Sequence, residues 1–336
     1  MFSGNPEGFK PLTGCPIKNF GHDRQHKRIF ILLITTVLPE VQLIFITGAS
    51  GFVGGHLVDY LIARGHRVRC LARSESAIDS LSAKGAEVVS GDITRPETLK
   101  GILNSDDFIF HLVGIIQEKG TATFESVHRE GTSSLVAEAR RAGVRHFFYQ
   151  SALGADRNSW SGYLRTKAEA EEIVRQSGLR YTIFRPSLII GPWDGFTKKL
   201  VEMIKYSPVL LISGEGMAKF QPLYIRDWLA CAGKVIENPD SYVSAYEIGG
   251  PEHLTYREIV EKLSKAMGHD RPAFKIPMGL MRLGASVFEK VLSAPPVTSD
   301  QLRLLEQDNI CDPKSIEKAF GFIPVKYEEA LKEFIS

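Results

Sequence analysis

One short stretch constrains the fold of this chain more than any other: a glycine-rich turn between an apolar run and an amphipathic segment. Leu43–Thr47 is apolar and β-branched, and residues 52–64 have the spacing of a helix with one apolar face. Glycine lets the backbone turn tightly and approach a ligand, and N–H groups at the start of a helix attract negative charge. Strand, glycine turn and helix in this order predict a site for the pyrophosphate of a dinucleotide. We expect it to be formed by Gly48, Ser50, Gly51, Phe52, Val53 and Gly54.

The alternation of strand and helix continues along the first half of the chain. Apolar runs and amphipathic runs follow one another with short connections, which predicts a parallel, doubly wound sheet. We therefore expect an α/β protein with a Rossmann-type NAD(P)-binding domain over residues 41–190. The expected strands are 43–47, 67–72, 87–90, 108–112, 146–150 and 180–185, and the expected helices are 52–64, 96–103, 124–142 and 163–176.

The ends of the expected strands bring polar and small residues to one crevice, because ligands of such sheets bind beyond the carboxyl ends of the strands. For Asp92 two interpretations stay open. Its carboxylate reaches the adenine amino group of the ligand, or it stabilises the turn before Thr94. The residues expected around the crevice are Arg73, Ser74, Asp92, Ile93, Leu112, Val113, Gly114 and Ser151.

The second strand ends in a basic rather than an acidic residue. A site for NAD normally has Asp or Glu at this point to accept a hydrogen bond from the ribose 2′-hydroxyl, whereas arginine suits a 2′-phosphate. Here the strand is followed by Arg73 and Ser74. A charge-assisted contact between arginine and phosphate contributes about 1.5–3 kcal/mol, so the sequence predicts NADP(H) over NAD(H). The alternative is that Arg73 is a solvated loop cation.

A tyrosine and a lysine four residues apart begin the expected helix 163–176. Tyr163 and Lys167 therefore lie on one helix face, and Ser151 follows the preceding strand. A neighbouring ammonium favours a phenolate, and a decrease of about 3 units in the pKa of Tyr163 corresponds to roughly 4 kcal/mol. We expect Tyr163 as acid/base, Ser151 on the substrate oxygen, and Lys167 on both Tyr163 and the nicotinamide ribose. A tyrosine and lysine at this spacing are by themselves more often surface residues.

Together these motifs resemble the short-chain dehydrogenase/reductase superfamily. The resemblance is carried by TGASGFVG at residues 47–54, GDIT at 91–94, HLVG at 111–114 and YLRTK at 163–167. It is closest to the atypical, NmrA-like and extended members, and among them to the group related to the NADPH-carrying accessory subunit of respiratory complex I. FHLVGII at 110–116, TIFRPSLIIGPWDGF at 182–196 and YEIGGPEHLTYREI at 246–259 carry that closer resemblance.

The resemblance implies a Ser, Tyr, Lys active group on a Rossmann-type fold, with Pro186 closing over the nicotinamide. Members of this group also hold a cofactor without turning it over, so two functions stay open. The first is an oxidoreductase that uses Tyr163 on a small apolar or quinone-like carbonyl or alcohol. The second is a non-catalytic NADPH-binding module that supports a respiratory complex I or quinone-related system.

Residues 191–336 are expected to form a smaller mixed α/β substrate lobe, interleaved with the Rossmann core. The expected helices are 196–206, 225–237, 255–267 and 278–292, with strands near 209–212 and 245–248. Helix 278–292 is apolar over more than one face, which suits either a buried lid or contact with a membrane or a partner. The cleft candidates, which are alternatively ordinary lobe core, are Trp193, Phe196, Lys198, Phe220, Gln221, Pro222 and Tyr224.

Residues 1–40, the net charge and the cysteines of the chain exclude several classes of protein. Residues 1–40 place a basic stretch before an apolar run without a small-residue cleavage site, so we expect a flexible or non-native extension rather than a signal peptide. Lys plus Arg total 41 against 39 Asp plus Glu, too balanced for a nucleic-acid partner. The four cysteines lie far apart, so we expect neither a metal site nor a disulfide framework. A cytoplasmic protein follows, with the inner face of a membrane as an alternative location and the oligomeric state open.

Overall fold

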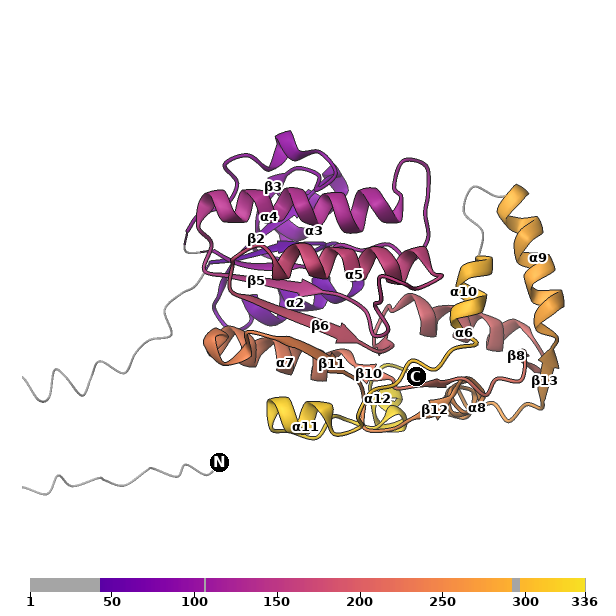
Figure 1. Cartoon of the computed structure of the whole chain (residues 1–336). Helices are drawn as coiled ribbons and strands as arrows, with labels where there is room; N and C mark the ends of the chain where they lie inside the picture. The colour runs from indigo at the N-terminus through magenta and orange to yellow at the C-terminus, as the bar shows by residue number, and fades with distance from the viewer. Residues whose placement is uncertain (1–42, 106, 292–296, 336) are drawn as a thin grey trace, which may run out of the picture. The chain divides into compact units, whose positions relative to one another are not determined.

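A seven-stranded parallel sheet forms the centre of the protein (Figure 1). The computed structural model describes residues 43–105, 107–291 and 297–335, so the expected extension 1–40 lies outside them. The strand order β11-β6-β5-β4-β1-β2-β3 reverses direction between β1 and β4, which confirms a doubly wound sheet. The strands are β1 Leu43–Thr47, β2 Arg67–Ala72, β3 Glu87–Ser90, β4 Phe108–His111, β5 His146–Gln150, β6 Tyr181–Pro186 and β11 Ala245–Ile248.

Two apolar clusters cover the two faces of the sheet, because successive strand side chains point to opposite sides. Ile44 and Ile46 of β1 belong to one cluster and Phe45 to the other. The first cluster includes residues of α2 Phe52–Ile62, α3 Glu75–Ala83 and α7 Ile225–Glu237; the second includes residues of α4 Gly131–Ala142 and α5 Gly162–Arg175.

Local structure departs from the expected helices in three places. Helix α3 was not expected, although Ser74 caps it by accepting the N–H of Ala77. The expected helix 96–103 is only the 3₁₀ turn η1, Pro96–Leu99, and Gly101 follows it at φ +76°. The expected helix 124–142 begins as the π-helical turn η2, Glu125–Glu130, before α4.

The second half adds helices and short strand pairs around one end of the sheet. The strand expected in the lobe at 245–248 is β11, which instead pairs with β6 and completes the central sheet. No helix in the described ranges is long and apolar enough to cross a membrane. The remaining elements are β7 Ile189–Ile190, α6 Gly195–Tyr206, β8 Leu210–Ser213, β9 Lys219–Phe220, β10 Leu223–Tyr224, η3 Pro239–Tyr242, β12 Leu254–Thr255, α8 Tyr256–Ala266, β13 Ala273–Ile276, α9 Met278–Val291, α10 Ser299–Leu304, α11 Ser315–Phe320 and α12 Tyr327–Phe334.

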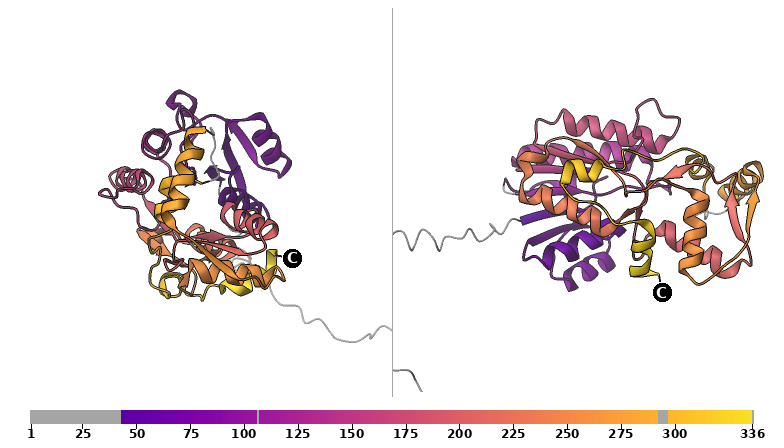
Figure 2. Two further views of the ribbon diagram at one scale, coloured as in Figure 1. Left: turned by 90° about the vertical axis from the view of Figure 1, so that its right-hand side faces the viewer. Right: turned by 90° about the horizontal axis from the view of Figure 1, so that it is seen from below.

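Helix α9 is not a buried core helix. It packs against α10, and both helices lie beside the part of the molecule where β8 and β13 pair (Figure 2). Leu280 and Leu283 are 62% and 64% exposed, and Phe288 is also exposed, whereas Ala285 is buried. The helix therefore presents apolar side chains to solvent on part of its surface.

Candidate functional site

The glycine turn after β1 is packed so closely that side chains are excluded at two positions. Gly48 has φ +82°, and a Cβ there would lie 2.9 Å from the backbone of Leu112 and Val113. A Cβ on Gly54 would lie 2.2 Å from the carbonyl oxygen of Gly48. The N–H of Gly51 donates to that same oxygen at 3.0 Å, which closes the turn. This cradle at the start of α2 fits a pyrophosphate, whose charge the helix N-terminus favours.

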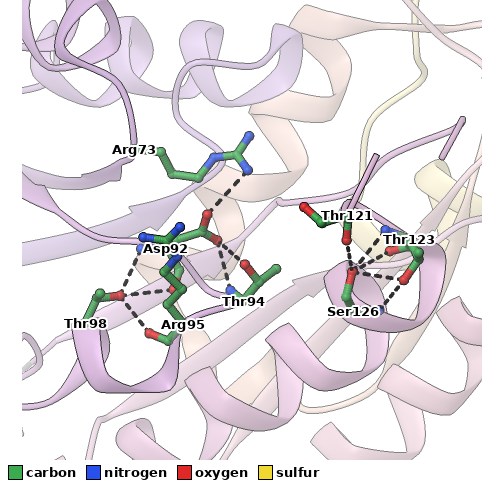
Figure 3. A network of polar contacts seen from close by, with 8 residues as sticks. All are labelled: Arg73, Asp92, Thr94, Arg95, Thr98, Thr121, Thr123 and Ser126. Atoms are coloured by element: carbon green, nitrogen blue, oxygen red, sulfur yellow. Dashed lines mark hydrogen bonds and ion pairs between the residues drawn. The ribbon is translucent and has the colours of Figure 1, made fainter. Parts of the chain in front are cut away.

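Arg73 and Asp92 lie together at the ends of β2 and β3 (Figure 3). Their Nη1 and Oδ2 atoms are 3.5 Å apart, and the Arg73 side chain is 69% exposed. The Asp92 Oδ1 atom accepts both the N–H and the hydroxyl of Thr94, each at 2.9 Å. Burial acts to raise the pKa of Asp92, but the Thr94 hydrogen bonds and the Arg73 charge lower it below its usual value. Asp92 thus has the expected turn role, and the Arg73 guanidinium faces solvent.

A hydroxyl-rich cavity of about 360 Å³ lies between the start of α2 and helix α3. Ser50 and Ser74, both expected at the site, line it together with Ser76, Ser80 and Lys84, which sequence analysis missed. Ser76, Ser80 and Lys84 follow one another at intervals of four residues, and this spacing in the sequence indicates a polar face of α3. The cavity can accommodate a polar group of a ligand held by the glycine turn.

The loop after β4 connects the glycine turn to Lys167. Leu112 and Val113 touch Gly48, and a Cβ on Gly114 would lie 3.0 Å from the Lys167 Nζ atom. Lys167 is only 4% exposed, and its Nζ donates to the carbonyl oxygen of Gln150 at 2.9 Å. Burial lowers the pKa of Lys167 to about 7, although the Glu171 carboxylate acts in the opposite direction. The lysine is thus aimed at the carboxyl end of β5.

Two other residues that were expected to bind the cofactor, Ile93 and Pro186, are buried in the protein. Ile93 is buried in the second apolar cluster and leaves no room for a side chain on Gly131. Pro186 is buried at the end of β6, where its carbonyl oxygen accepts the N–H of Leu153 at 3.0 Å. The side chains of both residues are packed against the protein, and their expected contacts with the cofactor stay a prediction.

Tyr163 is half-buried against two aromatic rings, those of Phe124 and His128. Burial raises the pKa of its hydroxyl to about 12. In this structure Lys167 therefore does not lower the pKa of Tyr163, and the expected lowering by Lys167 together with an oxidised nicotinamide stays a prediction. The physical reason is that desolvation dominates, while the lysine ammonium is directed at Gln150.

Ser151 lies at the same end of β5 but beside a buried ion pair. Burial raises the pKa of Glu171, yet Arg185, the nearby Ser151 hydroxyl and Arg175 together lower it below its usual value. Arg185 binds this carboxylate through two contacts of 2.8 and 2.7 Å, and Arg175 through one of 3.0 Å. Ser151 and Lys167 thus lie at the same end of β5, and the buried Ser151 hydroxyl has no hydrogen-bond partner among the residues that the structure describes.

The cleft candidates of the second half divide into two groups. Phe220 and Tyr224 are buried in the first apolar cluster. Gln221 is fully buried, donates to the Gly250 carbonyl oxygen at 2.6 Å and accepts the N–H of Cys311 at 2.7 Å. These three residues are lobe core. Trp193 is instead 87% exposed and lines, with Lys198, a cavity of about 570 Å³ beside the end of α12.

Helix α10 contacts both loops that lead toward Tyr163. The Gln301 side chain donates to the carbonyl oxygen of Ile116 at 3.2 Å, in the loop after β4. The Arg303 guanidinium lies 3.8 Å from the centroid of the Trp160 ring, in the loop before α5. Helix α10 therefore borders the Tyr163 end of the crevice, and α9 packs against α10.

The site geometry agrees with the comparisons to known proteins. Residues 48–200 match the family model described as NAD(P)H-binding, a stretch that contains the glycine turn, Tyr163 and Lys167. This stretch is an NAD(P)H-binding domain. The expected NAD(P)-binding domain and the expected fold class are thereby confirmed.

Several curated proteins with different names resemble the chain to a similar degree. Sterol demethylase protein B of Methylococcus capsulatus is 28% identical and covers 87% of this chain and 96% of its own length. Ceramide reductase of Caulobacter vibrioides is 29% identical, over 72% of this chain and 76% of its own. The mitochondrial NADH-ubiquinone oxidoreductase 40 kDa subunit of Neurospora crassa is 24% identical, over 80% and 72%.

The fold also matches solved structures. A UDP-glucose 4-epimerase of Thermus thermophilus in complex with NAD superposes with a TM-score of 0.67 at 18% identity, covering 87% of this chain and 97% of that one. At 18% identity this match shows that the two proteins share a fold, and nothing beyond that.

Proposed function

We propose that this protein is an NADPH-dependent reductase of carbonyl groups on apolar substrates. One observation carries the proposal: an unbroken line of contacts from the glycine turn to the Tyr163 helix. Gly48 touches the loop after β4, the same loop touches Lys167 at Gly114, and Lys167 lies one helical turn from Tyr163. A dinucleotide anchored at the glycine turn and lying along this line has its nicotinamide near Tyr163.

The raised pKa of Tyr163 suits the reductive direction. When bound, the cofactor supplies a hydride to the carbonyl carbon. With a pKa of about 12 the Tyr163 hydroxyl stays protonated, so it can donate its proton to the carbonyl oxygen as that oxygen gains negative charge. Lys167 holds the ribose hydroxyls, and Ser151 orients the substrate oxygen. The Ser151 hydroxyl is buried and has no hydrogen-bond partner within the described part of the chain, so it is available to bind the substrate oxygen.

Apolar side chains near the Tyr163 end favour an apolar substrate. Ile116 is exposed in the loop after β4, and Leu280, Leu283 and Phe288 are exposed on helix α9, which packs against the bordering helix α10. Two relatives carry names that specify a sterol demethylase protein and a ceramide reductase, both connected with lipids. We propose a substrate of this class, delivered from a membrane surface with which the protein makes peripheral contact.

The second candidate is the NADPH-binding module without turnover. The similarity to the 40 kDa subunit of NADH-ubiquinone oxidoreductase favours it. The deciding experiment offers NADPH with quinones, long-chain ketones and aldehydes, and sterol ketones, and follows the loss of NADPH absorbance. Turnover of any of them supports the reductase, whereas tight NADPH binding with no oxidation by any acceptor supports the module.

Arg73→Ala tests the preference for NADPH. We expect NADPH affinity to fall about 10- to 100-fold, because a charge-assisted contact to the 2′-phosphate is lost, while NADH affinity changes less than about twofold. Isothermal titration calorimetry measures both. Arg67→Ala is the matched control, since Arg67 is an exposed arginine at the opposite end of the same strand, paired with Glu87. Equal affinities for NADPH and NADH in the wild type would contradict the assignment.

Lys167 makes cofactor binding depend on pH. Its pKa of about 7 leaves the side chain mostly neutral at about pH 8, and the anionic cofactor favours the protonated form. Binding at about pH 8 should therefore take up close to one proton, binding at about pH 6 almost none, and affinity should fall as pH rises above about 7. Calorimetry in buffers of different ionisation enthalpy counts the protons. Lys167→Met should abolish the uptake and Lys100→Met, on the surface, should not; an unchanged uptake in Lys167→Met would refute this assignment.

A further inference from the structure

A buried histidine joins the two segments that form the Tyr163 end of the crevice. His128 is 1% exposed and lies in the π-helical turn η2. Its Nε2 atom accepts the N–H of Ile115 at 3.0 Å, in the loop after β4. Its Nδ1 atom is 3.0 Å from the hydroxyl of Thr166, which lies in α5 between Tyr163 and Lys167.

The hydrogen bonds determine which nitrogen of His128 carries the proton. The Thr166 hydroxyl donates to the carbonyl oxygen of Gly162 at 2.8 Å, so it accepts from the histidine. Nδ1 must therefore be protonated, and Nε2 must be free to accept from Ile115. Burial and the charge of Lys167, with a smaller contribution from His111, lower the pKa of His128 to about 2. The ring therefore remains neutral over the physiological pH range.

The π-helical turn that carries His128 is held in place by its own polar contacts. The Ser126 hydroxyl contacts the hydroxyl of Thr123 at 3.0 Å and the carbonyl oxygen of Thr121 at 3.2 Å (Figure 3). The N–H of Phe124 donates to the Glu118 carboxylate at 2.7 Å. Such turns are rare and occur frequently at functional sites, because the extra residue displaces a side chain from its regular helical position.

His128 also contacts the groups proposed to act in the reaction. Its ring packs edge-on against Tyr163 with centroids 5.6 Å apart. A Cβ on Gly114 would lie 3.6 Å from its Nε2 atom and 3.0 Å from Lys167 Nζ, so Gly114 leaves space that the two side chains share.

We propose that His128 is a positioning residue: its neutral Nδ1–H imidazole ties the loop after β4 to α5 and thereby places Lys167 and Tyr163 relative to the nicotinamide. The proposal rests on the proposed function for its effect on turnover. It acts through geometry, and His128 itself takes no part in proton transfer. Misplacement of reacting groups by about 1 Å costs on the order of 100-fold in rate.

Three variants separate the two hydrogen bonds. His128→Ala removes both, His128→Asn places an amide donor where Nδ1 was, and His128→Gln places an acceptor where Nε2 was. We expect kcat to fall about 10- to 100-fold in His128→Ala, with NADPH affinity about 3- to 10-fold weaker, and each amide variant to recover part of the loss. KM for the carbonyl substrate should change less than kcat.

His146→Ala is the matched control for general destabilisation. His146 is equally buried and bonds Thr182, but it lies at the amino end of β5, away from the site. We expect His146→Ala to lower the melting temperature at least as much as His128→Ala while leaving kcat and NADPH affinity near wild type. Two outcomes overturn the proposal. In the first, activity falls in proportion to melting temperature in both His128→Ala and His146→Ala. In the second, all three His128 variants keep the kcat and the NADPH affinity of wild type.

A measurement independent of turnover separates this proposal from the proposed function. Nitrogen-15 NMR of the ring should show a protonated Nδ1, an unprotonated Nε2 and no titration between about pH 5 and 8. If wild type reduces no acceptor, the proposed reductase fails, and the His128 proposal is then decided by this spectrum and by the loss of NADPH affinity in His128→Ala. A protonated Nε2 overturns the assignment whether or not the protein is an enzyme.

Discussion

Replacing Gly54 by alanine is expected to lower NADPH affinity by on the order of 100-fold or more. The new Cβ would lie 2.2 Å from the Gly48 carbonyl oxygen and 2.8 Å from the Ala49 Cα. Both contacts are backbone atoms, so the cradle itself must open. Overpacking of this kind also destabilises the fold by about 1–3 kcal/mol. Calorimetry with NADPH and thermal unfolding measure the two effects.

A glycine of helix α9 provides the control. A Cβ on Gly279 would meet no atom within 4 Å. Gly279→Ala should therefore leave the glycine turn unchanged and keep NADPH affinity within about threefold of wild type. Retention of tight binding in Gly54→Ala would show that the pyrophosphate is held elsewhere.

Tyr163→Phe should reduce turnover about 10²- to 10⁴-fold, because it removes the proton donor and only one oxygen atom. The ring that packs against Phe124 and His128 is kept, so folding should be unaffected. NADPH affinity should remain close to wild type. Steady-state kinetics with the acceptor found in the carbonyl screen give the decisive ratio of kcat values.

Tyr206→Phe is a suitable control, because Tyr206 is 88% exposed at the end of α6. Its turnover should equal that of wild type. If Tyr163→Phe retains full activity, Tyr163 has no role in proton transfer and the hydride acceptor must obtain its proton from another group. Lys167→Ala should differ from Tyr163→Phe by weakening NADPH binding as well as turnover.

Local patterns predicted most of the sheet and the outline of the site. The strands β1 to β6 follow apolar runs bounded by Gly, Pro or charged residues, and the order of strand, glycine turn and helix predicted the cradle at Gly48 and Gly54. The spacing of Tyr163 and Lys167 predicted their common face on α5. These features depend on backbone geometry within a few residues, so they can be read directly from the chain.

The same local reasoning was insufficient where partners come from distant segments. Strand β11 joins β6 across more than fifty intervening residues, and its short sequence AYEI does not specify its neighbour. The position of Ile93 at a strand end did not show that its side chain packs against Gly131 in the second apolar cluster. The segment expected as helix 96–103 is only a 3₁₀ turn, and Gly101 with its positive φ follows it. The segment expected as helix 124–142 begins as a π-helical turn, in which the N–H of Ser126 donates to the Thr123 hydroxyl.

The sequence by itself determined that this chain forms a parallel α/β domain with a dinucleotide cradle and a Tyr, Lys pair on one helix, because each is a pattern of neighbouring residues. Only the tertiary structure decided the electrostatic state of that pair. Burial raises the pKa of Tyr163 and lowers that of Lys167, the opposite of what an exposed ion pair would do. It also decided the hydrogen-bond partners of His128 and the arginines that pair with Glu171. Desolvation and hydrogen bonding depend on which distant segments exclude water from a group, and spacing along the chain carries no record of that.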